Sequence, residues 1–84
     1  MIVDTMTESI RRFVVDTFPL ARTQSIGVDD RLLETGIVDS LGVLSLVGYL
    51  EAEFSVTIED DDLVPENFQT IGRLAAFIQS KIAR

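Results

Sequence analysis

Apolar side chains recur at helical spacing in three stretches of the chain, and residues typical of turns separate these stretches. Before the first stretch, Thr5 and Glu8 have the spacing of a capping box, a motif that starts helices. The apolar positions that follow are Ile10, Phe13, Val14 and Phe18. This pattern predicts a first helix over residues 7–17 that ends before Pro19.

The second stretch predicts a helix over residues 40–54, with Asp39 or Ser40 as its N-cap. One apolar face of this helix is expected to be core: Val43, Leu46, Val47, Leu50 and Phe54. Another face is uncharged and begins beside Ser40: Leu41, Leu44, Ser45, Gly48 and Ala52. Two interpretations of this second face stay open, a wide buried stripe or a docking surface, and Leu41 and Leu44 suit both.

The third stretch predicts a last helix that begins after Thr70, a favourable N-cap. Its apolar positions are Ile71, Leu74, Ala75, Ile78 and Ile82, with Phe77 nearby.

Two connections separate the three helices. Residues 19–39 are expected to form a long loop, because Pro19, Gly27 and Gly36 are turn signals. Its apolar members are expected to hold it against the core: Leu20, Ile26, Leu32 and Leu33. Residues 55–69 are expected to be irregular, with a short helix somewhere in 60–68. The fold class is therefore all-α: a small antiparallel four-helix bundle of three main helices and a short third helix, with a long loop between helices 1 and 2.

The chain has 84 residues, which predicts a single domain over 1–84, and we expect a monomer. Its net charge of −7 disfavours nucleic acid and anionic membranes as partners and favours basic protein surfaces, although acidity also simply aids solubility. The first eight residues carry two acids and no base, unlike a signal peptide, and no stretch approaches the roughly 20 apolar residues that cross a bilayer. We therefore expect a cytoplasmic protein.

The residue types that are missing exclude several chemistries. The chain has no histidine and no cysteine, so a Ser-His-Asp or Cys-His mechanism and a zinc site of imidazole or thiolate ligands are excluded. The acidic run at residues 59–62 invites a calcium interpretation, but the glycine required at the sixth loop position is replaced by Pro65, and a solvated loop is favoured. We expect neither a metal site nor catalytic residues; a small hydrolase using Asp39 or residues 60–62 has the least support.

The most informative segment is Gly36-Ile37-Val38-Asp39-Ser40-Leu41, which closes the long loop and opens the second helix. A serine there is exposed at a helix N-terminus, where backbone N–H groups face outward and favour an anion. Taken alone, Ser40 is most simply an N-cap, but the position also suits a serine that is modified with a phosphate-linked group.

The chain resembles the acyl carrier and peptidyl carrier protein family over roughly residues 7–82. The specific part runs from Leu33 to Phe54: a glycine four residues before the serine, the Asp39-Ser40-Leu41 junction, and a helix that ends Leu50-Glu51-Ala52-Glu53-Phe54. The resemblance implies that Ser40 is the covalent attachment site for 4′-phosphopantetheine, which a phosphopantetheinyl transferase would move from coenzyme A. The terminal thiol of that arm would hold an acyl or aminoacyl group as a thioester for delivery to partner enzymes.

One departure from the family's fatty acid carriers bears on partners. Those carriers line the exposed side of this helix with acids. This chain has small residues there and acids only at the far end, Glu51 and Glu53; the small residues are Gly42, Ser45, Gly48 and Ala52. The resemblance thus favours a stand-alone carrier of specialised metabolism or amino-acid loading, similar to D-alanyl carriers, that works with an adenylating acyl or aminoacyl ligase and downstream acyl-processing enzymes. The expected partner-docking residues are Asp39, Leu41, Leu44 and Gly48. A housekeeping fatty acid carrier and a non-covalent acidic helical adaptor remain as alternatives, and the cargo is left open.

Overall fold

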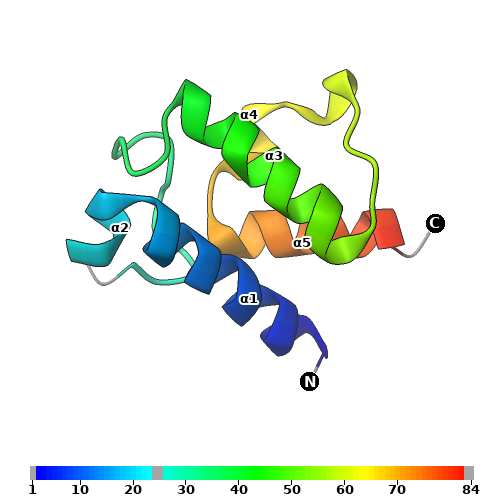
Figure 1. Ribbon diagram of the computed structural model, residues 1–84, viewed down its shortest axis with the longest axis horizontal. Helices are drawn as coiled ribbons and strands as arrows, with labels where there is room; N and C mark the ends of the chain where they lie inside the picture. Colours follow the sequence, from blue (N-terminus) through cyan, green and yellow to red (C-terminus); the bar gives the residue numbers. More distant parts are fainter. Residues whose placement is uncertain (1, 24–25, 83–84) are drawn as a thin grey trace.

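Three longer helices form the body of the structure, a computed structural model that describes residues 2–23 and 26–82 (Figure 1). They are α1 (Ile2–Thr17), α3 (Ser40–Phe54) and α5 (Ile71–Ile82). Shorter elements lie between them: α2 (Pro19–Thr23), the 3-10 helix η1 (Asp60–Asp62) and α4 (Pro65–Phe68). Within the described ranges the chain has no strand, and the all-α prediction is confirmed. None of the helices in those ranges is long and apolar enough to cross a membrane.

The three helices enclose a core built from the predicted apolar stripes. Among the described residues, the ten largest fully buried side chains are Ile10, Val14, Ile26, Leu32, Val38, Leu46, Leu50, Ile71, Leu74 and Ile78. Full burial of an aliphatic side chain of this size stabilises a fold by about 1.5–3 kcal/mol. On α3, the predicted core positions Val43, Val47 and Phe54 are half-buried and pack against this cluster. At the end of α5, however, Ile82 is 48% exposed, because the core ends at Ile78 one turn earlier.

The first helix is longer than expected. It begins at Ile2 rather than at residue 7, so Thr5 and Glu8 lie inside α1 and the capping-box prediction is wrong. The physical reason is burial, because Met6 continues the stripe of Ile10 and Val14 one turn toward the N-terminus.

The predicted long loop also contains a short helix. α1 ends at Thr17 as expected, but Pro19 then starts α2, since proline suits the first position of a helix, where the missing N–H is not needed. In this helix Ala21 is buried and Leu20 is 45% exposed, so Leu20 does not hold the connection to the core as predicted. The core contacts come from the expected Ile26 and Leu32, and from two buried residues that were not expected, Ile37 and Val38.

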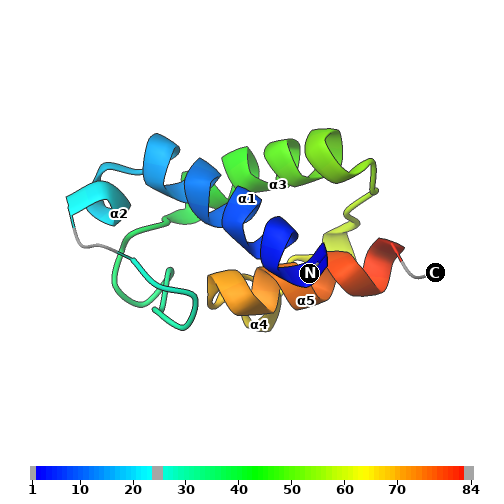
Figure 2. The same cartoon turned by 90° about the horizontal axis from the view of Figure 1, so that it is seen from below.

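The helix directions differ from an antiparallel bundle. α1 runs opposite to α3, but α3 and α5 run in the same general direction, as their colours show in both views (Figures 1 and 2). The connection over residues 55–70 must therefore return along the bundle before α5 can begin. That return contains η1 and α4, which confirms the short helix expected in 60–68. It also brings residues 63–65 beside the start of α3.

Candidate functional site

The start of α3 is fixed by a side-chain cap. Asp39 has an extended backbone, and its Oδ1 accepts a hydrogen bond from the Gly42 N–H at 2.7 Å. The Asp39 carbonyl accepts the first helical bond, from the Val43 N–H at 3.0 Å. The helix bounds match the prediction, and Asp39 rather than Ser40 is the N-cap. Ser40, the first helical residue, is exposed, and among the described residues no group hydrogen-bonds its hydroxyl.

The loop before α3 is seated firmly against the rest of the bundle. The Leu32 N–H donates to the Gln69 carbonyl at 2.9 Å, and the Val38 N–H donates to the Leu32 carbonyl at 3.0 Å. The turn between them needs Gly36, whose φ of 78° lies in the left-handed region that other residues avoid. Val38 is fully buried, and the next two residues, Asp39 and Ser40, are exposed. The buried Val38 therefore fixes where these two residues reach the surface.

A groove of about 410 Å³, here called the serine groove, opens beside Ser40. Its lining comes from the loop before α3, the first turn of α3 and the returning connection: Leu33, Gly36, Val38, Asp39, Ser40, Val43, Leu63, Val64, Pro65 and Phe68. Asp39 is the one charged residue of this lining. The sequence analysis did not find the groove, because only the direction of the connection places residues 63–65 there; the signal was the apolar Leu63-Val64 pair between an acidic run and a proline.

The outward face of α3 is exposed and uncharged. Leu41 is 75% exposed and Leu44 is 62% exposed, so the interpretation of this face as a buried stripe is wrong. Ser45, Gly48 and Ala52 continue the face and are exposed as well. Gly42, which was expected on the exposed side, is instead buried against Phe18 and Val38. A Cβ added at Gly48 would meet nothing within 4 Å, which leaves the middle of this face open to close approach.

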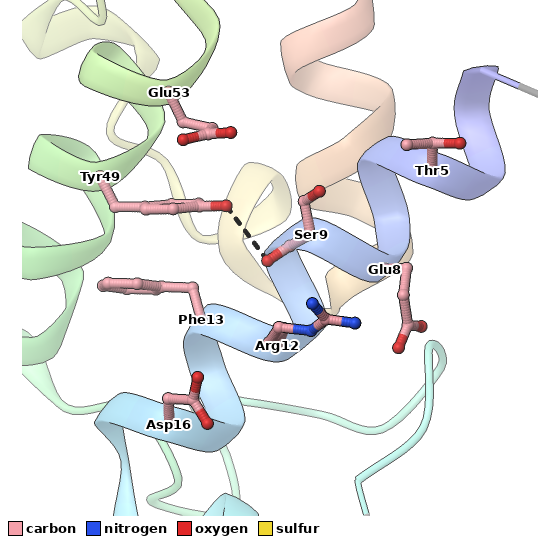
Figure 3. A pocket seen from close by; sticks show the side chains of 8 residues that line it. All are labelled: Thr5, Glu8, Ser9, Arg12, Phe13, Asp16, Tyr49 and Glu53. Carbon is pink, nitrogen blue, oxygen red and sulfur yellow. Dashed lines mark hydrogen bonds between the residues drawn. The ribbon is translucent and has the colours of Figure 1, made fainter.

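The two acids of α3 lie in its last turn, at the opposite end of the helix from Ser40. Glu51 is half-buried, and its Oε2 accepts a hydrogen bond from the Ile58 N–H at 2.9 Å. Glu53 lies on the side that faces α1, where it lines a second groove (Figure 3). A chain of net charge −7 therefore presents a helix face without charge directly after Ser40.

The second groove is larger, about 720 Å³, but it lies between α1 and α3 and does not include Ser40. The Tyr49 ring stacks on the Phe13 ring with centroids 4.2 Å apart, and its hydroxyl donates to the Ser9 carbonyl at 3.1 Å (Figure 3). Burial, and secondarily the negative charge of Glu53, raise the pKa of Tyr49 above its ordinary value. These contacts join α1 to α3.

The side chains that line the serine groove around Ser40 are mostly apolar, and Asp39 is the charged member of the lining. The chain offers no histidine or cysteine to activate the hydroxyl. Among the described residues, no group of three or more acidic, histidine or cysteine side chains is arranged to hold a metal ion. The acidic run instead forms η1, where the Asp62 carboxylate accepts the Glu59 N–H and pairs with Lys81.

Comparison with known proteins agrees with this arrangement. Residues 8–78 match the family described as phosphopantetheine attachment site. This stretch covers most of the chain, and the protein belongs to that family of carrier proteins. The family match and the similar proteins support an acyl carrier role and a 4′-phosphopantetheine prosthetic group.

Individual relatives are similar over shorter stretches. The chain is 43% identical to an acyl carrier protein of Exiguobacterium sibiricum over 44 residues, which is 52% of this chain and 53% of that protein. It is 36% identical over 55 residues to the probable acyl carrier protein PigG of a Serratia species, 63% of each chain. The match thus spans about half to two thirds of these relatives. A solution structure of a holo acyl carrier protein from Nitrosomonas europaea superposes with a TM-score of 0.78 at 27% identity, and covers 94% of this chain and 98% of that one.

Proposed function

We propose that Ser40 is the residue that carries the 4′-phosphopantetheine arm, and that residues 1–84 act as one carrier unit. The observation that carries the proposal is the exposed Ser40 hydroxyl at the mouth of the serine groove, with no partner among the described residues. Because Asp39 already caps α3, the Ser40 hydroxyl is not needed for the helix and is available for modification.

The residues around Ser40 suit this group. The first backbone N–H groups of a helix favour a phosphate oxygen, and the Ser40 oxygen would form the ester bond to that phosphate. The apolar lining of the serine groove offers contact to an uncharged chain beside the attachment point. When bound, the arm supplies the thiol for thioester chemistry, which this cysteine-free chain lacks. The protein itself would be without catalytic activity.

We further propose a stand-alone carrier of specialised metabolism or amino-acid loading, with a phosphopantetheinyl transferase, an adenylating acyl or aminoacyl ligase and acyl-processing enzymes as partners. Carrier proteins in general work with such transferases and acyl-processing enzymes. The uncharged outward face of α3 supports this choice over a housekeeping fatty acid carrier, whose docking helix would carry acids. Partner enzymes would then contact Leu41, Leu44 and Gly48, with the exposed Asp39 at the edge.

The test is incubation of the purified chain with coenzyme A and a broad-specificity phosphopantetheinyl transferase, followed by intact-mass measurement. The wild-type chain is expected to gain one phosphopantetheine mass, and Ser40→Ala is expected to gain none. Ser80→Ala is the matched control, because Ser80 is an exposed serine of α5 outside the serine groove, and it should be modified like the wild type.

An unmodified wild-type chain, in a reaction that modifies a known carrier, contradicts the proposal. Salt-sensitive binding to a basic protein that Ser40→Ala leaves unchanged would then favour the non-covalent adaptor. An intact-mass spectrum of the protein from its native host would show the arm and its cargo together.

A further inference from the structure

The ring of Phe18 lies directly against the first turn of α3, at a residue that has no side chain. A Cβ added at the buried Gly42 would lie 2.7 Å from Phe18 Cε1 and 3.2 Å from Phe18 Cζ. It would also lie 3.1 Å from Val38 Cγ1. Ordinary contact begins at 3.4 Å, so an alanine at position 42 would push the ring and the helix apart by several tenths of an ångström.

Phe18 is one end of a row of four rings that joins α1 to α3. Phe18 meets Phe13 edge to face at 6.3 Å, and Phe13 stacks on Tyr49 at 4.2 Å. Tyr49 in turn meets Phe54 edge to face at 6.2 Å. The row therefore contacts α3 at its first turn, its middle and its last residue. The Phe18 ring cannot move freely, because it contacts the Phe13 ring. Phe13 is in turn stacked on Tyr49, and the Tyr49 hydroxyl is fixed by its hydrogen bond to the Ser9 carbonyl.

We infer that Phe18 and Gly42 form a steric pair that sets the position of the first turn of α3 and thereby presents Ser40 to the modifying enzyme. Gly42 is two residues from Ser40, and its N–H is the donor of the Asp39 cap. A shift at Gly42 therefore moves the cap and the serine together. Both residues act as positioning residues, and the inference rests on Ser40 as the attachment site.

The pair predicts an unusual response to substitution. An alanine in a helix is normally more stable than a glycine, so intrinsic propensity alone predicts that Gly42→Ala raises stability. The steric pair predicts the opposite: a lower urea midpoint, and a kcat/KM for phosphopantetheinyl transfer that is lowered by about tenfold. A misplacement of about 1 Å can cost about 10²-fold in rate, and the shift expected here is smaller. Phe18→Leu removes both ring atoms in conflict, including the nearest one, and leaves Val38 Cγ1 at 3.1 Å. The double variant is therefore expected to regain most of the transfer rate lost by Gly42→Ala.

The experiment measures transfer kinetics with coenzyme A and one transferase for the wild type, both single variants and the double variant, with urea unfolding of each. Gly27→Ala is the matched control, because a Cβ there has its nearest neighbour at an ordinary 3.6 Å, and it should keep the wild-type rate. An unmodified wild-type chain overturns the proposed function. With a modified wild type, a normal rate for Gly42→Ala overturns the steric pair alone. The steric pair is also overturned if the double variant of Gly42→Ala and Phe18→Leu regains stability without regaining the rate of phosphopantetheinyl transfer.

Discussion

The Asp62 carboxylate and the Lys81 ammonium form an ion pair, with Oδ2 and Nζ 2.5 Å apart. It joins η1 to the last turn of α5, and the two side chains are only 21% and 10% exposed. None of the three residues of η1 is itself buried. The Asn67 side chain adds a hydrogen bond to the Asp62 carbonyl at 2.8 Å. Polar contacts therefore fix η1, whereas the buried Phe68 holds the later part of the returning connection, which forms one wall of the serine groove.

We expect Lys81→Met to lower the free energy of unfolding by about 1–2 kcal/mol, between the values typical of exposed and of fully buried pairs. The loss should change little between low and moderate salt, because a largely buried pair is weakly screened. Urea unfolding at two salt concentrations measures both effects. Arg73→Met removes a positive charge from the exposed side of the same helix and should stay within about 0.5 kcal/mol of the wild type. Equal losses for the two variants would contradict a role for the pair.

Asp39 caps α3 and Ser40 does not, and this difference gives a second prediction. Asp39→Ala removes the hydrogen bond to the Gly42 N–H and should cost about 1 kcal/mol in urea unfolding. Asp39→Asn keeps an acceptor at that place and should cost less. Ser40→Ala should stay within about 0.5 kcal/mol of the wild type, since the described residues give its hydroxyl no partner. A larger loss for Ser40→Ala than for Asp39→Ala would show that the serine, not the aspartate, caps the helix.

The sequence predicted what depends on local signals. Residue type and spacing account for the bounds of α3 and for the positive φ of Gly36. They also account for the cap of α5, where the Thr70 hydroxyl accepts a hydrogen bond from the Arg73 N–H at 3.0 Å. Two of the features that the sequence did not predict depend on tertiary packing. The early start of α1 follows from burial of Met6, and the serine groove follows from the return of the chain between α3 and α5.

The outward face of α3 gives a third prediction, about partners. Leu44→Glu places a charge where we propose an apolar contact, and should lower kcat/KM for phosphopantetheinyl transfer by about tenfold or more, as expected for loss of 1.4 kcal/mol of binding. The same direction is expected for loading by the cognate ligase and for a charge at Gly48. Because Leu44 is 62% exposed, its replacement should leave unfolding nearly unchanged.

Glu53→Gln is the comparison for that experiment, because Glu53 lies on the α1 side of the helix. It should reduce transfer and loading less than Leu44→Glu does. Equal effects, or a larger effect of Glu53→Gln, would contradict docking through an apolar face.

Tyr49 gives the last prediction, on alkaline pH. Burial is the main cause that raises its pKa in the folded protein above the ordinary 10.0, and Glu53 adds to it. The folded state thus favours the neutral phenol. The contribution of the neutral Tyr49 to stability is therefore fully present below pH 10 and is lost as pH rises through the folded-state pKa.

At neutral pH, Tyr49→Phe should lower the free energy of unfolding by about 1 kcal/mol, because it loses the hydrogen bond to Ser9 but keeps the stack on Phe13. The difference in unfolding free energy between wild type and Tyr49→Phe should shrink above pH 10. Since Tyr49 is the chain's single tyrosine, phenolate absorbance reports its pKa directly, and Glu53→Gln should lower that pKa part of the way toward 10.0. A folded-state pKa at or below 10.0 would contradict both the burial and the charge argument.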